Sequence, residues 1–419
     1  MRSNLSKQHY PADKQIDFLF VTYGGGHVKM VLPIAEKLLK DGYSVYIFAL
    51  TTAINTLKHT SVPYFSYKDL PYAKNLDVIR QGKILMKTIE HNNFVEETET
   101  ISYLGINFLD LEKQIGKIET IKLWKKGGRQ FFYPINTMRN LLKDLRPNFV
   151  ISTNSPRSEK AAIDAARLEN IKSVCLCDLL VIPESEWLKN NDFADFLFVI
   201  DDRVKKMLVS KGRNKDQIKV TGNPAFDSIN DNQNILKAKK YKIDNGLLGP
   251  NINILYASSP EPKMHPFTNE PGDKNLPNKI EKVLRDFVSV NKDFNLILRR
   301  HPSQNQEITE GERIYKSSLD IDFNIMVHVP DLIIQVASTI GMQAIIANKL
   351  LLNVDCSIFT NDTPYTKMGF GTGINSLNKL PTAILDTLSN NSLKKEYKPT
   401  QDALKNVTKE LKKIYDTYS

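Results

Sequence analysis

Three consecutive glycines and a histidine form the stretch with the most evident chemistry. Gly24, Gly25, Gly26 and His27 follow directly on the apolar run 18–21, which has the pattern of a buried parallel strand. Glycines let the backbone approach a ligand closely, and a helix that begins after them offers free N–H groups to an oxyanion or phosphate. An imidazole with a pKa near neutrality can take a proton from a hydroxyl. The stretch therefore predicts a catalytic loop; the alternative is a glycine turn with a solvated histidine.

A second group of polar residues follows apolar runs in the C-terminal half. The residues concerned are Ser258, Ser259, Arg299, Arg300, His301, Ser338 and Thr339. Two arginines, several hydroxyls and a helix start suit a diphosphate, because guanidinium groups supply forked donors and helix N–H groups satisfy the remaining oxygens. We therefore predict an anion site, with the alternative that one arginine forms a structural ion pair.

Several other chemistries lack the motifs that they require. The histidines show no metal-ligand spacing and no D-x-D motif is present, so neither a metal nor another cofactor is predicted. The glycines lack the G-x-G-x-x-G and Walker A patterns, and a G-x-S-x-G elbow is absent. Three cysteines cannot form a full disulfide set, and no apolar stretch reaches the roughly 18–20 residues that span a bilayer. These features predict a reduced, cytoplasmic protein.

The elements that must position these residues alternate between short apolar runs and helical segments. This rhythm predicts an α/β fold with parallel, doubly wound sheets, whose strand-to-helix loops all reach the same sheet edge. We predict an N-terminal domain at 1–228 with a helical insertion at about 70–135, a C-terminal domain at 229–395, and a final helix at 396–419. Residues 229–251 lose the pattern and are predicted to be the interdomain connection.

The net charge of +10 is concentrated in residues 113–146. Nine basic residues lie there against only Glu119 and Asp144, together with Trp124, Phe131, Phe132 and Tyr133. Interleaved basic and aromatic residues suit an anionic membrane surface, so we predict peripheral contact with the inner membrane through this segment. The alternative is a solvated helix face with a few core aromatics. Nucleic acid is not predicted as a partner, because no known binding motif accompanies the charge.

Several segments together resemble GT-B nucleotide-sugar glycosyltransferases. The glycine loop with His27, Val28 and Pro33 is similar to the acceptor-side loop of the enzyme that adds N-acetylglucosamine to the peptidoglycan lipid intermediate. The block 195–227 resembles one shared by capsule and lipopolysaccharide glycosyltransferases and by nonhydrolysing UDP-N-acetylglucosamine 2-epimerases. Arg300-His301-Pro302 and the run 338–344 look like donor-site loops of capsule-type transferases. The resemblance covers roughly residues 17–390.

The resemblance implies two Rossmann-like domains that face each other across a cleft, and it assigns roles to particular residues. His27 would be the general base for the acceptor hydroxyl, beside an acceptor-side loop of Gly24, Gly25, Gly26 and Asn154. Gln343 falls where many relatives carry a glutamate that grips the ribose. The implied donor-binding residues are Ser258, Ser259, Arg299, Arg300, His301, Ser338, Thr339, Gly341, Met342 and Gln343.

The implied function is a glycosyltransferase that moves a sugar from a nucleotide-sugar donor to a hydroxyl of a glycan or lipid-linked acceptor. The reaction would be inverting and metal-independent, and would serve capsule or lipopolysaccharide assembly. One alternative is a nonhydrolysing UDP-N-acetylglucosamine 2-epimerase, although its expected Ser-Gly-Gly stretch and paired glutamates are missing around residues 338–344. Two further alternatives are a CDP-glycerol glycerophosphotransferase-like polymer transferase and a non-enzymatic module that binds a glycan or partner.

Overall fold

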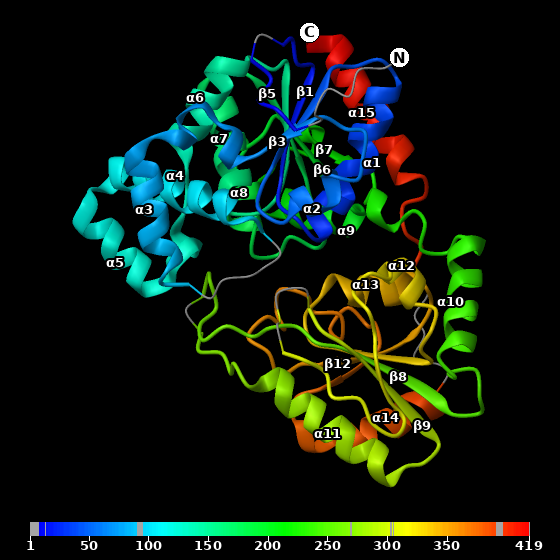
Figure 1. Cartoon of the computed structure of the whole chain (residues 1–419). Coiled ribbons are helices and arrows are strands. Elements are labelled where there is room, and N and C mark those ends of the chain that lie inside the picture. The colour runs from blue at the N-terminus through cyan, green and yellow to red at the C-terminus, as the bar shows by residue number, and fades with distance from the viewer. Residues whose placement is uncertain are drawn as a thin grey trace, which may run out of the picture. The chain divides into compact units, whose positions relative to one another are not determined.

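The chain divides into two compact units, which are described separately. The computed structural model describes residues 8–12, 14–89, 95–268, 270–301, 304, 306–390 and 397–418. Unit 1 comprises residues 1–225 together with 400–419, and unit 2 comprises residues 226–399. The chain therefore enters unit 2 after unit 1 and returns to unit 1 with its last helix (Figure 1).

Unit 1 is built on a sheet of seven strands, all parallel, in the order β3-β2-β1-β4-β5-β6-β7. The central strands are apolar and buried along their whole length, as expected for a sheet covered on both faces. The strands are β1 (Phe18–Thr22), β2 (Val45–Ala49), β3 (Tyr64–Phe65), β4 (Phe149–Thr153), β5 (Lys172–Leu176), β6 (Phe196–Val199) and β7 (Ile218–Val220).

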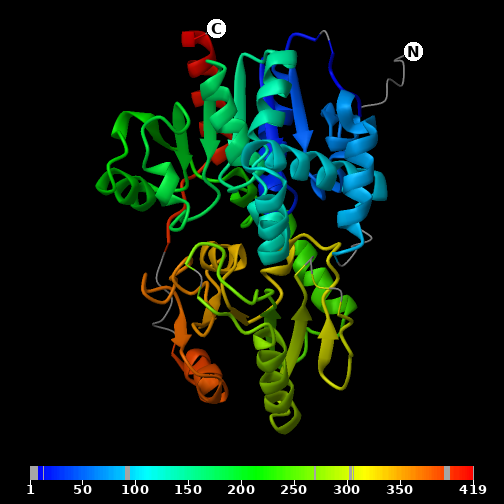
Figure 2. The ribbon, with the colours of Figure 1, turned by 90° about the vertical axis from the view of Figure 1, so that its left-hand side faces the viewer.

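Helices cover both faces of this sheet (Figures 1 and 2). A helical insertion separates β3 from β4, in the region where the sequence predicts one. It contains η1 (Tyr67–Asp69), η2 (Pro71–Lys74), α3 (Leu76–Met86), α4 (Glu97–Ile115), α5 (Lys117–Gly127), η3 (Gly128–Phe131) and α6 (Ile135–Leu145). The other helices of unit 1 are α1 (Gly26–Lys40), α2 (Ala53–Leu57), α7 (Ser158–Leu168), α8 (Ser185–Leu188), α9 (Asp202–Ser210), η4 (Lys215–Gln217), η5 (Pro224–Phe226, at the unit boundary) and α15 (Ala403–Tyr418).

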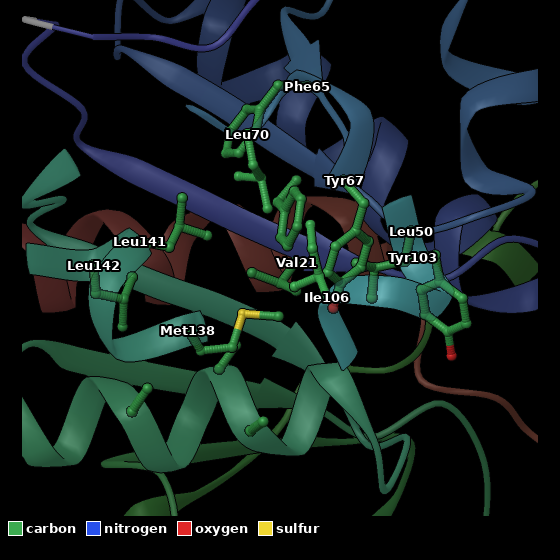
Figure 3. Close-up of a cluster of buried hydrophobic side chains, with 14 of the residues drawn as sticks. Val21, Leu50, Phe65, Tyr67, Leu70, Tyr103, Ile106, Met138, Leu141 and Leu142 are labelled. Atoms are coloured by element: carbon green, nitrogen blue, oxygen red, sulfur yellow. The ribbon is translucent and has the colours of Figure 1, made fainter. Parts of the chain in front are cut away.

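Alternate residues of β1 enter two different cores. Leu19 and Val21 join a cluster formed with the insertion helices and α7, part of which is drawn in Figure 3. Phe18 and Phe20 join the cluster on the other face, which includes residues of α1 and α15. This alternation is the strand period of two, with both faces buried. The insertion is therefore packed into the body of unit 1 rather than attached at its surface.

Unit 2 repeats the same design with six parallel strands in the order β10-β9-β8-β11-β12-β13. The strands are β8 (Ile252–Ala257), β9 (Phe294–Arg299), β10 (Ile314–Lys316), β11 (Leu332–Gln335), β12 (Leu350–Val354) and β13 (Thr372–Ile374). The helices are α10 (Asn232–Asp244), α11 (Leu276–Val290), α12 (Phe323–Met326), α13 (Thr339–Ile346), η6 (Leu377–Lys379) and α14 (Leu380–Ser389). Two parallel, doubly wound α/β sheets are thus confirmed.

The segment 229–251 differs from its prediction as a patternless connection. Most of it forms α10, a helix of 13 residues in which Ala238 is the buried residue. A helix that buries so little shows almost no apolar periodicity, so the sequence gives no helical signal there. The short edge strands β10 and β13 were likewise not predicted, because three residues carry no readable alternation.

The aromatic residues of the basic segment 113–146 pack into or against the core of unit 1, as in the alternative of a helix face with a few core aromatics. Phe132 is buried and its ring stacks on that of Trp124, with 5.6 Å between ring centroids. Phe131 and Tyr133 pack against the same cluster. Within the residues that the structure describes, no helix combines the length and apolarity needed to cross a membrane.

Candidate active-site edges of the two units

Each sheet has one point where the strand order reverses, and some of the predicted residues follow the strands that flank it. In unit 1 the reversal lies between β1 and β4, and in unit 2 it lies between β8 and β11. Open α/β sheets bind ligands in the crevice outside the carboxyl ends of the strands at such a point. His27 follows β1 and Asn154 follows β4, whereas Ser258 follows β8 and Ser338 follows β11.

Close packing explains Gly24, and backbone conformation explains Gly25, in the turn that leads from β1 into α1. A Cβ atom on Gly24 would lie 2.2 Å from Oγ1 of Thr52 and 2.9 Å from the backbone nitrogen of Ala53. Gly25 has φ of 70° and ψ of −131°, a conformation that side chains disfavour. The glycines therefore allow a tight turn that delivers His27 to the first turn of α1.

His27 is held by a buried carboxylate from another element. Its Nδ1 lies 3.0 and 3.1 Å from the two carboxylate oxygens of Glu159, in the first turn of α7, and also contacts Oγ1 of Thr153. An ionised carboxylate only accepts hydrogen bonds, so Nδ1 carries the proton of this pair. The other ring nitrogen, Nε2, is then the one that can exchange a proton with a ligand, and the His27 side chain is 23% exposed.

Glu159 is fully buried, and the fold satisfies its charge. Its carboxylate accepts hydrogen bonds from the backbone N–H groups of Tyr23 at 2.7 Å and Ser155 at 3.0 Å, and from the Thr153 hydroxyl. Burial alone would raise the pKa of Glu159, but the charge of His27 and these hydrogen bonds lower it below its ordinary value. Glu159 and His27 therefore form a buried ion pair with a fixed geometry.

The prediction of a near-neutral pKa for His27 is wrong in this structure. Burial lowers the pKa of the imidazole, but Glu159 above all, then Asp178 and Glu184, outweigh burial and raise it to about 9. Nε2 lies 3.8 Å from a carboxylate oxygen of Asp178. At neutral pH the ring is consequently an imidazolium, with a proton on both nitrogens.

Asn154 serves to position the neighbouring loop. Its side-chain oxygen accepts a hydrogen bond of 3.0 Å from the backbone N–H of Asp178, and Asn223 donates one of 2.8 Å to the carbonyl of the same residue. Asn154 is 4% exposed. It therefore holds Asp178, just beyond β5, in place near Nε2 of His27. Its predicted place at the acceptor-side loop stays a prediction.

Three residues of this edge were not found from the sequence as site residues: Thr153, Glu159 and Asp178. Local sequence signals exist for Asp178 and Glu159. Asp178 is an acid placed directly after a buried apolar strand, and Glu159 is an acid in the first turn of a helix that follows a strand. Neither signal identifies His27 as the partner, because Glu159 is 132 residues away along the chain.

A chain of buried hydroxyls connects the glycine loop to the helical insertion. The hydroxyls of Tyr23 and Tyr67 each lie 3.0 Å from Oγ of Ser158, and Tyr67 also approaches the side chain of Asn107 on α4 at 3.5 Å. The guanidinium of Arg157 stacks over the Tyr23 ring at 4.6 Å. These contacts fix α4 against the loop that carries His27.

The edge of unit 2 presents the start of α13. Oγ of Ser338 accepts a hydrogen bond of 3.3 Å from the backbone N–H of Ile340 and thereby caps the helix. A Cβ atom on Gly341 would lie 2.4 Å from the ring of Tyr365, whose hydroxyl donates to the Ser338 carbonyl at 3.0 Å. Gly341 thus gives Tyr365 the space to brace the turn that includes Thr339.

The two arginines after β9 lie in different environments. Arg299 is 8% exposed and donates hydrogen bonds of 2.7–2.9 Å to Oγ of Ser317 and to the carbonyls of Ser318 and Ile321. Arg300 forms an ion pair with Glu281 of α11. Arg300 therefore forms the structural ion pair raised as the alternative, and its role at an anion site stays a prediction. Arg299 instead forms hydrogen bonds within the fold.

The remaining residues predicted to bind the donor differ in how far their side chains are buried. The Met342 side chain is fully buried in unit 2, so only its backbone is open to a ligand. Gln343 donates a hydrogen bond of 2.8 Å to Asn324. Ser259 is half-buried after β8, Ser258 is 5% exposed, and His301 is exposed. Pro302, the last residue of the predicted Arg-His-Pro motif, lies outside the described residues.

Comparison with known proteins identifies the fold but no sequence family. No family model and no curated protein matches the chain. In the described part of the chain, no group of three or more His, Cys, Asp or Glu side chains is arranged to hold a metal ion.

Solved structures match over nearly the whole chain. UDP-GlcNAc 2-epimerase from Neisseria meningitidis, bound to UDP-GlcNAc, has a TM-score of 0.60 and 12% identity over 94% of this chain and 99% of that one. A putative UDP-N-acetylglucosamine 2-epimerase from Listeria monocytogenes has a TM-score of 0.58 and 14% identity over 97% and 98%. The Methanocaldococcus jannaschii enzyme, in complex with UDP-GlcNAc and UDP, has a TM-score of 0.58 and 12% identity over 96% and 99%. Identities this low establish the fold alone: the chain has the two-domain, GT-B-like fold of these UDP-N-acetylglucosamine 2-epimerases.

Proposed function

We propose that this protein is an enzyme that acts on a nucleotide-linked sugar, with His27 as the residue that transfers a proton. The observation that carries the proposal is the buried Glu159 carboxylate on Nδ1 of His27, located at the strand-order reversal of unit 1. A histidine whose second nitrogen is bonded to a carboxylate has a fixed tautomer and ring orientation, which proton transfer in an active site requires. A histidine placed only to close a turn would not need such a partner.

The raised pKa of His27 supports one order of proton transfer over the other. Because the pKa of His27 is about 9, the free enzyme at neutral pH holds a proton on Nε2. His27 is then ready to act as a general acid, and it acts as a general base only after that proton has left. A general-acid role predicts activity that falls as pH rises through about 9, whereas a general-base role predicts activity that rises up to that pH.

For unit 2 we propose a site for the donor diphosphate at the start of α13. One supporting feature is the capped N-terminus of α13, with Ser338 and Thr339. The other is the guanidinium of Arg300, which directly follows β9. Ser258, Ser259, His301 and the backbone at Gly341, Met342 and Gln343 complete the proposed group. Arg299 supports this edge from within the fold.

Two reactions of such an enzyme remain as specific candidates. The comparisons lend more support to epimerisation at C2 of UDP-N-acetylglucosamine, because the solved structures reported above carry that name over almost the full chain. The residues 338–344 lend more support to transfer of the sugar to a hydroxyl acceptor, because they lack the Ser-Gly-Gly stretch and paired glutamates of the epimerases. We retain both, as enzymes of one fold with different chemistry.

One experiment separates them. The protein is incubated with UDP-N-acetylglucosamine alone in D₂O, and the sugar is followed by proton NMR. Epimerisation at C2 breaks the C2–H bond, so it predicts the 2-epimer together with deuterium at C2. Transfer predicts an unchanged donor until a hydroxyl acceptor is supplied. If neither this nucleotide sugar nor UDP, CDP, GDP or CMP raises the melting temperature, the proposal of a nucleotide-sugar enzyme is overturned.

We also propose that unit 1 contacts an anionic membrane surface, and the exposed residues around α5 support this. Ile118 of α5 is 76% exposed and Leu76 of α3 is 82% exposed. Exposed basic residues on α5 accompany them: Lys117, Lys122, Lys125 and Lys126. Apolar side chains flanked by lysines are typical of helices that lie on anionic lipid. A lipid-linked acceptor would suit an enzyme held in this way.

A further inference from the structure

The helical insertion contains a pocket that neither the catalytic edge of unit 1 nor the proposed donor site includes. It has a volume of about 610 Å³ and is lined by residues of η2, α3, α4, α5 and α6. Pockets of this size hold small molecules of several rings. His27, Thr153, Glu159 and Asp178 are not among its lining residues.

The wall between α3 and α4 is rigid because the two helices touch through their backbones. A Cβ atom on Gly82 would lie 2.1 Å from the carbonyl oxygen of Ile101, and one on Gly105 would lie 2.1 Å from that of Val78. Such contacts exist only because both positions are glycine. This wall therefore keeps its shape in the absence of a ligand.

The wall between α4 and α6 is fixed by one buried carboxylate. Asp110, which is 4% exposed, accepts hydrogen bonds from the backbone N–H and hydroxyl of Thr137 at 2.5 and 2.6 Å. It also accepts bonds from the side chains of Asn136 at 3.1 Å and Gln114 at 2.7 Å. The first turn of α6 has no other side-chain cap, so Asp110 supplies it from α4.

The chemistry of the lining fits a neutral ligand with many hydroxyl groups. Its charges cancel, with three acids (Asp77, Asp110, Glu112) and three bases (Arg80, Lys113, Lys117), and Arg80 is paired with Asp77 at 2.7 Å. Gln81 and Asn140 contribute amides with both donors and acceptors, whereas the side chains of Asn136 and Thr137 are already engaged by Asp110. Leu109 adds partly exposed apolar surface on which a sugar ring can lie, and the buried Val78 and Ile106 lie behind the lining. A phosphate would need an excess of positive charge, which is absent.

We propose that this insertion pocket binds a neutral oligosaccharide, as a glycan site separate from the reaction centre. The pocket and the reaction centre are on different sides of α4. Asn107 approaches the hydroxyl of Tyr67 and the ring of Tyr103 packs against the Tyr67 ring, whereas Asp110 lines the pocket. The inference does not depend on which reaction His27 serves.

The test is calorimetric titration of the full chain with maltotriose, cellotriose and chitotriose. The test variant is Gln81→Ala with Asn140→Ala, two lining residues outside the Asp110 cap, and the matched control is Asn232→Ala with Gln233→Ala on exposed positions of α10. We expect saturable binding of at least one trisaccharide, weakened at least about tenfold in the test variant and unchanged in the control, since a tenfold change corresponds to about 1.4 kcal/mol.

Three results would overturn the proposal. The first is no saturation by any of the three sugars up to about 10 mM, which is weaker than about 3 kcal/mol of binding. The second is equal binding by the test variant and the wild type. The third is binding of UDP that the Gln81 and Asn140 changes abolish, because the pocket would then serve an anion. The titration measures sugar binding and not turnover, so its result can be interpreted even if the proposed enzymatic function is wrong.

Discussion

Units 1 and 2 have the same sheet topology around their reversal points, yet those points carry opposite electrostatics. In unit 1, Glu159 is buried with His27, and Asp178 stands on the other side of the imidazole. In unit 2, Arg299 and Arg300 follow the strand next to the reversal, and a capped helix N-terminus lies on its other side. The topology therefore determines where a ligand can bind, and the residues after each strand determine what kind of chemistry occurs there.

The two units also differ in how tightly their charged groups are tied. The carboxylate of Glu159 accepts hydrogen bonds from four donors, one of which is Nδ1 of His27. The second ring nitrogen of His27, Nε2, takes no part in these bonds. The guanidinium of Arg299 spends its donors on the 317–321 segment. A charged residue at a strand end can thus bind a ligand only if its hydrogen bonds within the fold leave at least one of its polar atoms without a partner.

Removing the imidazole should have the largest effect on activity. We expect His27→Gln to lower turnover by roughly 10²–10⁴-fold, the usual share of a general acid or base, with nucleotide-sugar affinity little changed. The measurement is steady-state turnover with parallel calorimetric binding, and His59→Gln at an exposed position is the matched control. If His27→Gln keeps near wild-type turnover, His27 has no catalytic role and the glycine loop is only a structural turn.

Loss of the imidazolium also leaves Glu159 charged and unpaired, which costs about 3–5 kcal/mol for a buried pair. The double variant His27→Gln/Glu159→Gln removes both charges and should recover part of that stability without recovering turnover. Comparing the melting temperatures of the two variants separates a folding defect from a catalytic one.

The next largest effect is on the titration of His27. In Glu159→Gln we expect its pKa to fall from about 9 toward or below the ordinary value of 6.5, because burial is then less opposed. Asp178→Asn should give a smaller fall, since Asp178 lies 3.8 Å away rather than 3.0 Å. Imidazole NMR signals recorded against pH measure both shifts, and equal shifts would contradict this ranking.

The same pKa predicts how stability depends on pH. A folded pKa of about 9 against 6.5 unfolded means that His27 contributes stability that is fully present below pH 6.5 and is lost as pH rises through about 9. Thermal melts of the wild type and the double variant should therefore converge over this range. A difference that stays constant with pH would show that His27 is not protonated in the folded protein.

In unit 2 the two arginines should respond differently to substitution. Arg299→Ala removes hydrogen bonds from a charged donor to one buried and two half-buried acceptors, so we expect a stability loss of about 1.5–3 kcal/mol. Arg300→Gln should weaken nucleotide binding and also lower stability, because it breaks the buried ion pair with Glu281. Denaturant melts and UDP titrations of both variants give the comparison, and it fails if Arg299→Ala leaves the melt unchanged.

The smallest effect belongs to Met342. Its side chain is fully buried, so Met342→Leu should cost less than about 1.5 kcal/mol and leave nucleotide affinity unchanged. A large loss of UDP affinity with an unchanged melting temperature would instead show that the Met342 side chain contributes to donor binding.

The sequence allowed the strands that carry site residues to be predicted, because continuous apolar runs mark strands buried on both faces. It did not allow α10 to be predicted, since a helix that buries only Ala238 leaves no stripe. His27 was found because glycines and a strand precede it, but its pKa was not, because the acids that set it come from α7 and the loop after β5. The pairing of Arg300 with Glu281 of α11 was hidden for the same reason.

The return of α15 to unit 1 has a consequence for synthesis of the chain. Val407, Leu411 and Ile414 of α15 complete the core that contains Phe18 and Phe149 of the central strands. While the ribosome is still translating unit 2, that face of the unit 1 sheet lacks its last covering helix. Unit 1 therefore completes its core only after unit 2 has been synthesised, and in the interval this apolar face is exposed to aggregation.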